Sequence, residues 1–162
     1  MIMDYNLILS NAQDLSGAGS VASTSYIDMS GGTLFNTGNA TNFGQDVGVG
    51  SGVNVPKVVF QIGVAFTTAT SVNFQIQGSV DNSTYTTYIE TGAVLIANLT
   101  VGAMISVDLP RRIFGASLPR YLRAYYVIAG SNPGAGTVTS AVVLTPGIWD
   151  GGVYPSNFTV AA

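Results

Sequence analysis

The chain has 162 residues, of which 5 are Lys or Arg and 8 are Asp or Glu, and it contains neither histidine nor cysteine. Charged residues make up 8% of it, against about 25% in an average soluble domain. The missing residue types exclude a Ser–His–Asp triad, a thiol nucleophile, disulfides and cysteine-based zinc sites. The net charge of −3 argues against binding to nucleic acid or an anionic membrane, because both need a basic face.

The chain begins with segments that carry little strand pattern. Residues 1–20 are expected to form an N-terminal arm with one short apolar segment, and a first strand is predicted at 24–29. Residues 31–56 contain seven Gly and four Asn in 26 positions, which predicts a long loop. The loop interrupts a single domain at 21–149, since a chain of this length buries enough surface for one core.

From residue 57 onward, apolar and polar residues alternate with period two, the pattern of a strand with one buried face. Further strands are predicted at 57–66, 72–77, 84–90, 94–99, 104–109, 121–128 and 137–145. About eight strands without helical periodicity predict an all-β fold, a jelly-roll sandwich of antiparallel strands. Residues 150–162 are expected to form a C-terminal tail with little regular structure.

The second face of these strands carries Gln, Asn, Thr and Ser where Lys and Glu are usual. An uncharged polar face can hydrogen-bond a partner at a modest desolvation cost. A neutral face in contact with solvent explains the same pattern equally well. Both interpretations stay open, although a surface so poor in charge favours one that is covered in an assembly.

Acidic residues are scattered and fall mostly at predicted turns or strand ends. A glycosidase needs two carboxylates that face each other across a cleft, and a calcium loop needs acids at alternate positions. Neither pattern is present, so we expect no enzyme activity, no catalytic residues, no cofactor, no metal and no small-molecule ligand. The acids are Asp4, Asp14, Asp28, Asp46, Asp81, Glu90, Asp108 and Asp150.

Four of the five cations lie between residues 111 and 123. A turn exposes Arg111 and Arg112, which favours an interface there, whereas Arg123 lies on a strand expected to be central. For Arg123 we expect internal pairing with acids such as Asp108 or Glu90 and stacking on Tyr. Arg and Tyr are the residue types that anchor protein interfaces. The interface candidates are Arg111, Arg112, Arg120, Tyr121, Arg123, Tyr125, Leu7, Leu9, Phe35 and Phe43.

Several segments, in their order and spacing, resemble one known family. They are Met1-Ile2-Met3-Asp4, Leu7-Ile8-Leu9-Ser10-Asn11-Ala12-Gln13, Tyr26-Ile27-Asp28-Met29, Asp46-Val47-Gly48-Val49-Gly50, Pro119-Arg120-Tyr121-Leu122-Arg123 and Gly136-Thr137-Val138-Thr139. Over residues 1–149 the chain resembles the Bbp16-like family of phage capsid cement, or decoration, proteins. It departs from that family in a longer Gly/Asn-rich segment at 31–45 and in the tail 150–162.

The resemblance implies a jelly roll that is made in the host cytoplasm and sits as a homotrimer on the outer surface of the virion capsid. There it bridges neighbouring major capsid proteins and carries no catalytic residues. The alternative is a carbohydrate-binding jelly roll of a phage fibre or adhesion structure, in which exposed aromatics stack on sugar rings. The aromatics available for that role are Tyr85, Tyr88, Tyr125, Trp149 and Tyr154.

Overall fold

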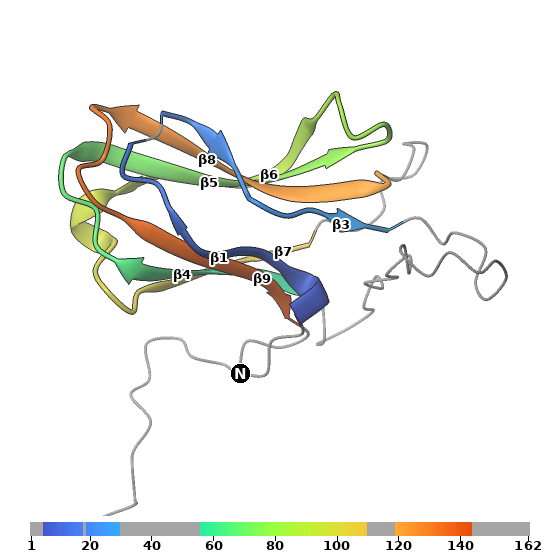
Figure 1. Cartoon of the computed structure of the whole chain (residues 1–162), viewed down its shortest axis with the longest axis horizontal. Coiled ribbons are helices and arrows are strands. Elements are labelled where there is room, and N and C mark those ends of the chain that lie inside the picture. Colours follow the sequence, from blue (N-terminus) through green and yellow to red (C-terminus); the bar gives the residue numbers. More distant parts are fainter. Residues whose placement is uncertain (1–4, 18, 30–55, 110–118, 144–162) are drawn as a thin grey trace, which may run out of the picture.

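The computed structural model describes residues 5–17, 19–29, 56–109 and 119–143, and it places two antiparallel sheets face to face (Figure 1). Two 3-10 turns, η1 (Tyr5–Leu7) and η2 (Ile96–Asn98), accompany the strands. No helix in these ranges is long and apolar enough to cross a membrane. The strands are β1 (Ile8–Asp14), β2 (Val21–Ala22), β3 (Ile27–Asp28), β4 (Lys57–Val64), β5 (Ala69–Ser79), β6 (Thr86–Leu95), β7 (Met104–Asp108), β8 (Tyr121–Gly130) and β9 (Thr137–Val143).

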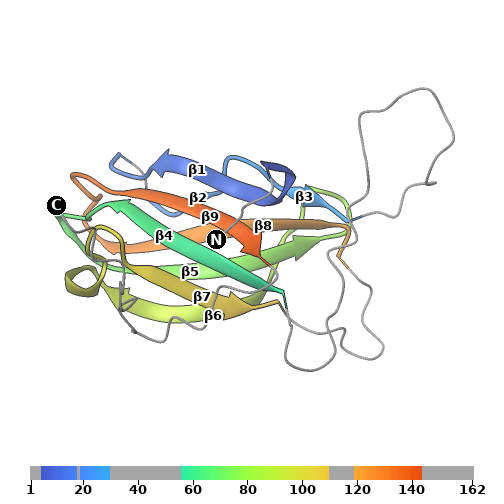
Figure 2. The ribbon, with the colours of Figure 1, turned by 90° about the horizontal axis from the view of Figure 1, so that it is seen from below.

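The first sheet has the strand order β1-β9-β4-β7, and the second has β2-β8-β5-β6, with β3 also paired to β8. β2 and β3 pair with different parts of β8, through Val21 with Tyr126 and Ile27 with Leu122. Counted as one interrupted edge strand, they give the second sheet four strand positions, as many as the first sheet has. Figure 2 looks onto the first sheet and shows β1 and β7 at its two edges, with β6 of the second sheet beside β7.

The core lies between the two sheets and follows from the period-two pattern. On β5, Val72, Phe74 and Ile76 are each 0% exposed, as the alternation at 72–77 predicts. They face the apolar residues of β4, and the Phe60 and Phe74 ring centroids lie 5.0 Å apart. Tyr126 of β8 packs edge-on against both rings. Full burial of such a side chain contributes about 1.5–3 kcal/mol. The predicted all-β sandwich is confirmed.

The expectation that residues 1–20 have no strand is wrong, because residues 8–14 form β1 and pair with β9 at the edge of the first sheet. Ala12 has a positive φ of 45°, and the register shifts twice along the pair. These irregularities disrupt the alternation of buried and exposed residues, which is the signal that identifies a strand in a sequence. β1 therefore lies in a largely polar segment whose sequence does not predict a strand.

Two other predicted boundaries are also wrong. The separate strands at 84–90 and 94–99 are one strand, β6, which ends at Leu95 and is followed by η2. Gly92 has a φ of +73°, a conformation that glycine adopts easily, and the β5–β6 register shifts nearby, so the strand bends without ending. Of the strand predicted at 24–29, only Ile27–Asp28 forms. The predicted loop up to residue 55 and the tail 150–162 lie outside the described residues.

Candidate interaction surface on the second sheet

The outer face of the second sheet carries a row of uncharged amides on β5. Asn73, Gln75 and Gln77 lie on the outer face because the residues between them point into the core, and neighbouring side chains leave Gln77 only 8% exposed. The predicted arrangement of apolar residues inside and uncharged polar residues outside is confirmed for this strand. We call Asn73, Gln75 and Gln77 the amide row.

A chain of hydrogen bonds runs along the amide row from a cation to an anion. Arg123 donates from Nε and Nη2 to Gln77 Oε1 at 3.0 and 2.9 Å, and Gln77 Nε2 donates to Gln75 Oε1 at 3.1 Å. Gln75 Nε2 and Asn73 Nδ2 both donate to Glu90 Oε2, at 2.8 and 2.9 Å. Both glutamines thus turn their oxygen toward the cation and their NH₂ toward the carboxylate, which fixes their orientation.

The side chains of the amide row are therefore hydrogen-bonded within the molecule. Thr87 adds a further hydrogen bond to Gln75 Oε1 at 3.0 Å. Linked dipoles of this kind strengthen one another and hold their side chains in one arrangement. Whether a partner or solvent covers this face stays a prediction, but all three amides already have hydrogen-bond partners within the chain. The surface is preorganised.

Arg123 stands at the positive end of this chain. It lies on β8, which has neighbours on both sides, as predicted for a central strand. The centre of its guanidinium is 3.5 Å from the centroid of the Tyr85 ring and 5.4 Å from that of Tyr125. The Tyr85 ring comes from the connection between β5 and β6, so this connection reaches over β5 to the next strand. Burial raises the pKa of the Tyr85 hydroxyl, and the charge of Arg123 partly opposes that rise.

The expected stacking of Arg123 on tyrosine is present, but the expected pairing with an acid is not. Within the described part of the chain, Arg123 makes no ion pair. Asp108 pairs instead with Lys57 on the neighbouring strand, at 2.6 Å. Glu90 is reached only through the two glutamines. Among the described residues, no carboxylate is therefore bonded directly to Arg123.

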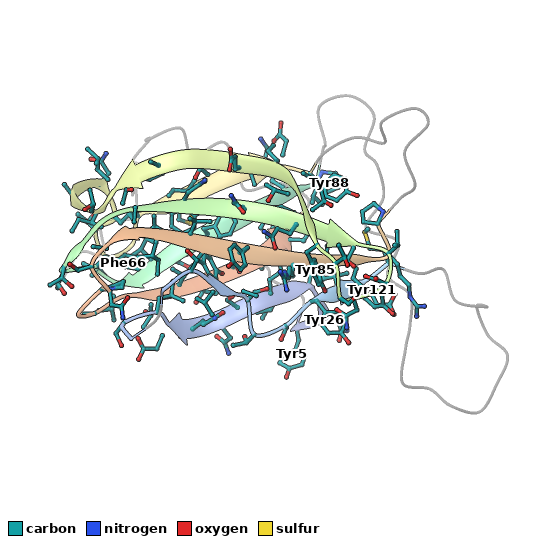
Figure 3. The ribbon with its side chains drawn as sticks, turned by 90° about the horizontal axis from the view of Figure 1, so that it is seen from above. Tyr5, Tyr26, Phe66, Tyr85, Tyr88 and Tyr121 are labelled. Carbon is teal, nitrogen blue, oxygen red and sulfur yellow. The ribbon has the colours of Figure 1, made fainter. Side chains whose placement is uncertain are left out.

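A second arginine and two tyrosines lie close by. Arg120 donates from Nε and Nη2 to the two carboxylate oxygens of Asp28, each at 3.0 Å, and this hydrogen bonding raises the pKa of Arg120. Its guanidinium also lies 4.9 Å from the Tyr121 ring, which meets Tyr26 edge-on at 5.5 Å. Figure 3 shows Tyr26, Tyr85 and Tyr121 toward one end of the second sheet, with Phe66 at the opposite end. We call Tyr26, Tyr85, Tyr121, Arg120 and Arg123 the Arg–Tyr cluster.

The structure brings four of the predicted interface residues together and rejects one. Tyr121, Arg123 and Tyr125 alternate on the outer face of β8, next to Arg120. Leu9 is 1% exposed and belongs to the main core, so it is not available to a partner and that part of the prediction is wrong. The half-buried Leu7 packs against the same core. The other candidates, Arg111, Arg112, Phe35 and Phe43, lie outside the described residues.

Sequence reasoning missed three residues of this surface, namely Gln77, Asp28 and Tyr26, and it considered Tyr85 only as a sugar-stacking residue. Gln77 pairs with Arg123 across β5 and β8, which are separated by more than 40 positions in the chain. No local pattern contains that pairing. The available signal was the outward position of Gln77, which the alternation does give.

Chemically, the surface is suited to binding. Across the described ranges, no group of three or more Asp, Glu, His or Cys side chains is placed to hold a metal ion. The molecule is thus a two-sheet β-sandwich with an Arg–Tyr cluster on one outer face. The family model for Bbp16 matches residues 9–143, from the beginning of β1 to the end of β9, and the chain belongs to the Bbp16 family. The resemblance seen in the sequence is confirmed at this level, and no curated protein matches the chain.

Proposed function

We propose that this protein is a capsid cement, or decoration, protein that binds the outside of a phage head as a homotrimer and bridges major capsid proteins. It is made in the host cytoplasm, and its final location is the outer surface of the virion. The observation that carries the proposal is the Arg–Tyr cluster on a rigid, charge-poor sandwich, in a chain whose family resemblance is to capsid cement proteins. Arginine and tyrosine dominate the binding energy of protein interfaces.

The physical properties of the fold support this role. A cement protein stabilises a shell by binding its assembled form in preference to free subunits, so the binding free energy adds to shell stability. Three copies joined around one axis make each further contact intramolecular, which raises the overall affinity through effective concentration. A preorganised surface such as the amide row loses little side-chain entropy on binding.

The proposal is tested on the purified full-length chain. Light scattering is expected to give three times the chain mass, and the protein is expected to co-sediment with mature heads that lack it. Decorated heads should release their DNA at a higher temperature than bare heads. A stable monomer without affinity for mature heads contradicts the proposal.

The alternative, carbohydrate binding, is supported less by the surface. Arg123 covers one side of the Tyr85 ring, and the amides that would hold sugar hydroxyls are already hydrogen-bonded within the chain. Binding of the purified protein to a glycan array, without binding to heads, would favour this alternative over the cement function.

A further inference from the structure

The guanidinium of Arg123 is held along one edge and open along the other. A guanidinium has five N–H donors in a planar fork. Gln77 Oε1 receives two of them, one from Nε and one from Nη2. Within the described residues, the Nη1 group and the second Nη2 proton make no hydrogen bond. The open edge thus offers two parallel donors, the geometry that a carboxylate accepts with both oxygens.

Among the described residues, the charge of Arg123 also has no direct counter-charge. The side chain is half-buried, stacked on Tyr85 and bonded to a neutral amide. Burial strengthens the attraction between such a cation and an incoming anion, because less water screens the pair. Stacking on a tyrosine ring and bonding to Gln77 already fix the side chain, so little rotamer entropy is left to lose.

We propose that Arg123 receives the carboxylate of an Asp or Glu side chain from a different protein, which under the proposed function is the shell protein. This inference rests on the proposed function and gives the chemistry of its contact. The carboxylate lies against the open Nη1–Nη2 edge, with the Arg–Tyr cluster and Tyr125 around it. With the carboxylate in place Arg123 is surrounded, and arginines enclosed in this way are typical of the residues that dominate interface energy.

A second copy of this chain is a less suitable source of the carboxylate, because its described acids already have partners within their own chain. Each has its own partners: Asp28 with Arg120, Asp108 with Lys57, Glu90 with Asn73 and Gln75, Asp81 with Ser79, Ser83 and Thr84, and Asp14 with Ser16. An acid taken from a second copy has to be shared between Arg123 and the partners that it already has. A carboxylate from another protein has no such cost within this chain.

The test compares R123K and R123Q with the wild type in co-sedimentation titrations on expanded heads that lack this protein. R123K keeps the positive charge but loses the two parallel N–H donors of the guanidinium, and R123Q loses both the charge and these donors. We expect each variant to lower the affinity by about tenfold or more, since both remove a planar two-donor contact. K57Q, which removes a half-exposed cation of the other sheet that is paired with Asp108, is the control and should stay within about twofold. Unchanged thermal melting shows that each variant is folded.

A chemical readout identifies the partner group directly. A carbodiimide activates a carboxyl and lets a nearby amine displace the activated oxygen, so that an amide forms and the reagent leaves as a urea. With heads saturated by R123K, the introduced amine is expected to couple to an Asp or Glu of the shell protein, as mass spectrometry of the cross-linked peptide will show. Coupling to an acid of this chain instead places Arg123 between copies and overturns the assignment.

The outcomes separate the two proposals. If the wild type does not bind heads, the proposed function and the partner both fail. If wild type and R123K bind heads equally well, the cement function stands and this inference is wrong. A change of oligomer mass in R123Q, measured by light scattering, likewise overturns it, because the arginine then holds copies of this chain together.

Discussion

At the scale of single residues, the buried hydroxyl of Tyr126 joins three strands from both sheets. Its oxygen lies 2.7 Å from Ser10 Oγ on β1 and 2.9 Å from Ser140 Oγ on β9, and all three residues are 0% exposed. Ser10 gives its own proton to Gln13 Oε1. Tyr126 therefore donates to Ser10, and Ser140 donates to Tyr126, because each hydroxyl has one proton.

We expect Y126F to lower the free energy of unfolding by about 1–3 kcal/mol, since it leaves two buried hydroxyls without a shared partner. Y125F is the matched control on the same strand, where the ring lies on the outer face, and it should change stability by less than about 0.5 kcal/mol. Denaturant titration measures both. Equal midpoints for the two variants would mean that the Tyr126 hydroxyl contributes nothing.

Stability should also fall in alkaline solution because of Tyr126. Burial raises the pKa of its hydroxyl above the ordinary 10.0, although its hydrogen bonds to serine oppose this. A folded-state pKa above the unfolded value gives stability that is complete below pH 10 and is lost as the pH rises through the folded pKa. Melting temperatures between about pH 9 and about pH 11 should therefore fall more steeply for the wild type than for Y126F. Parallel curves would contradict this.

At the scale of elements, β1 is part of the sandwich and its Leu9 belongs to the core. We expect L9A to destabilise the fold by about 2–5 kcal/mol, the usual cost of emptying a buried leucine site. I8A, next to it on the half-exposed side of β1, should cost clearly less. Thermal or denaturant melts of both variants test this. Similar losses of stability would mean that residues 1–20 form an arm outside the core, as predicted from the sequence.

The strands that could be predicted are those with a regular period. β7 and most of β8 alternate more and less buried residues, and β4, β5 and β9 do so over part of their length. All five were predicted within a few residues. β1 and β6 are bulged, so their pattern loses phase, and β1 was missed while β6 was divided. The register of a bulged pair is set by its partner strand, which a local pattern does not contain.

Only the part of the candidate surface that lies on β8 could be predicted from the sequence, for a related reason. Period two places Tyr121, Arg123 and Tyr125 on one face of a strand, and the sequence gives no more than that. The residues that fix Arg123, Gln77 and Tyr85, come from other parts of the chain through the pairing of β5 with β8. Long-range register was needed to see that a glutamine, rather than an acid, bonds this arginine.

At the scale of the whole molecule, charge is scarce, and among the described residues half of the charged side chains form ion pairs within the chain. Of 5 cations and 8 acids, Lys57 and Arg120 are paired with Asp108 and Asp28. Most of the surface available to a partner is therefore neutral, and neutral contacts are not screened by salt.

Binding to heads should accordingly depend little on ionic strength. Between about 50 and about 500 mM NaCl we expect the affinity to fall by less than about tenfold, with most of the fall removed in R123Q. Co-sedimentation at the two salt concentrations measures it. A much steeper loss would show that charged groups outside the described residues dominate the contact.

The pairing of β1 with β9 also bears on how the chain is made. Ile8 pairs with Ala141 and Asp14 with Thr137, so the first strand to leave the ribosome finds its partner last. β9 lies between β1 and β4, and a translation product that stops before it lacks the centre of the first sheet. Such a product also lacks Val138 and Val142 of the core, so we expect it to remain unfolded. The strand order therefore makes assembly of the first sheet depend on the synthesis of β9.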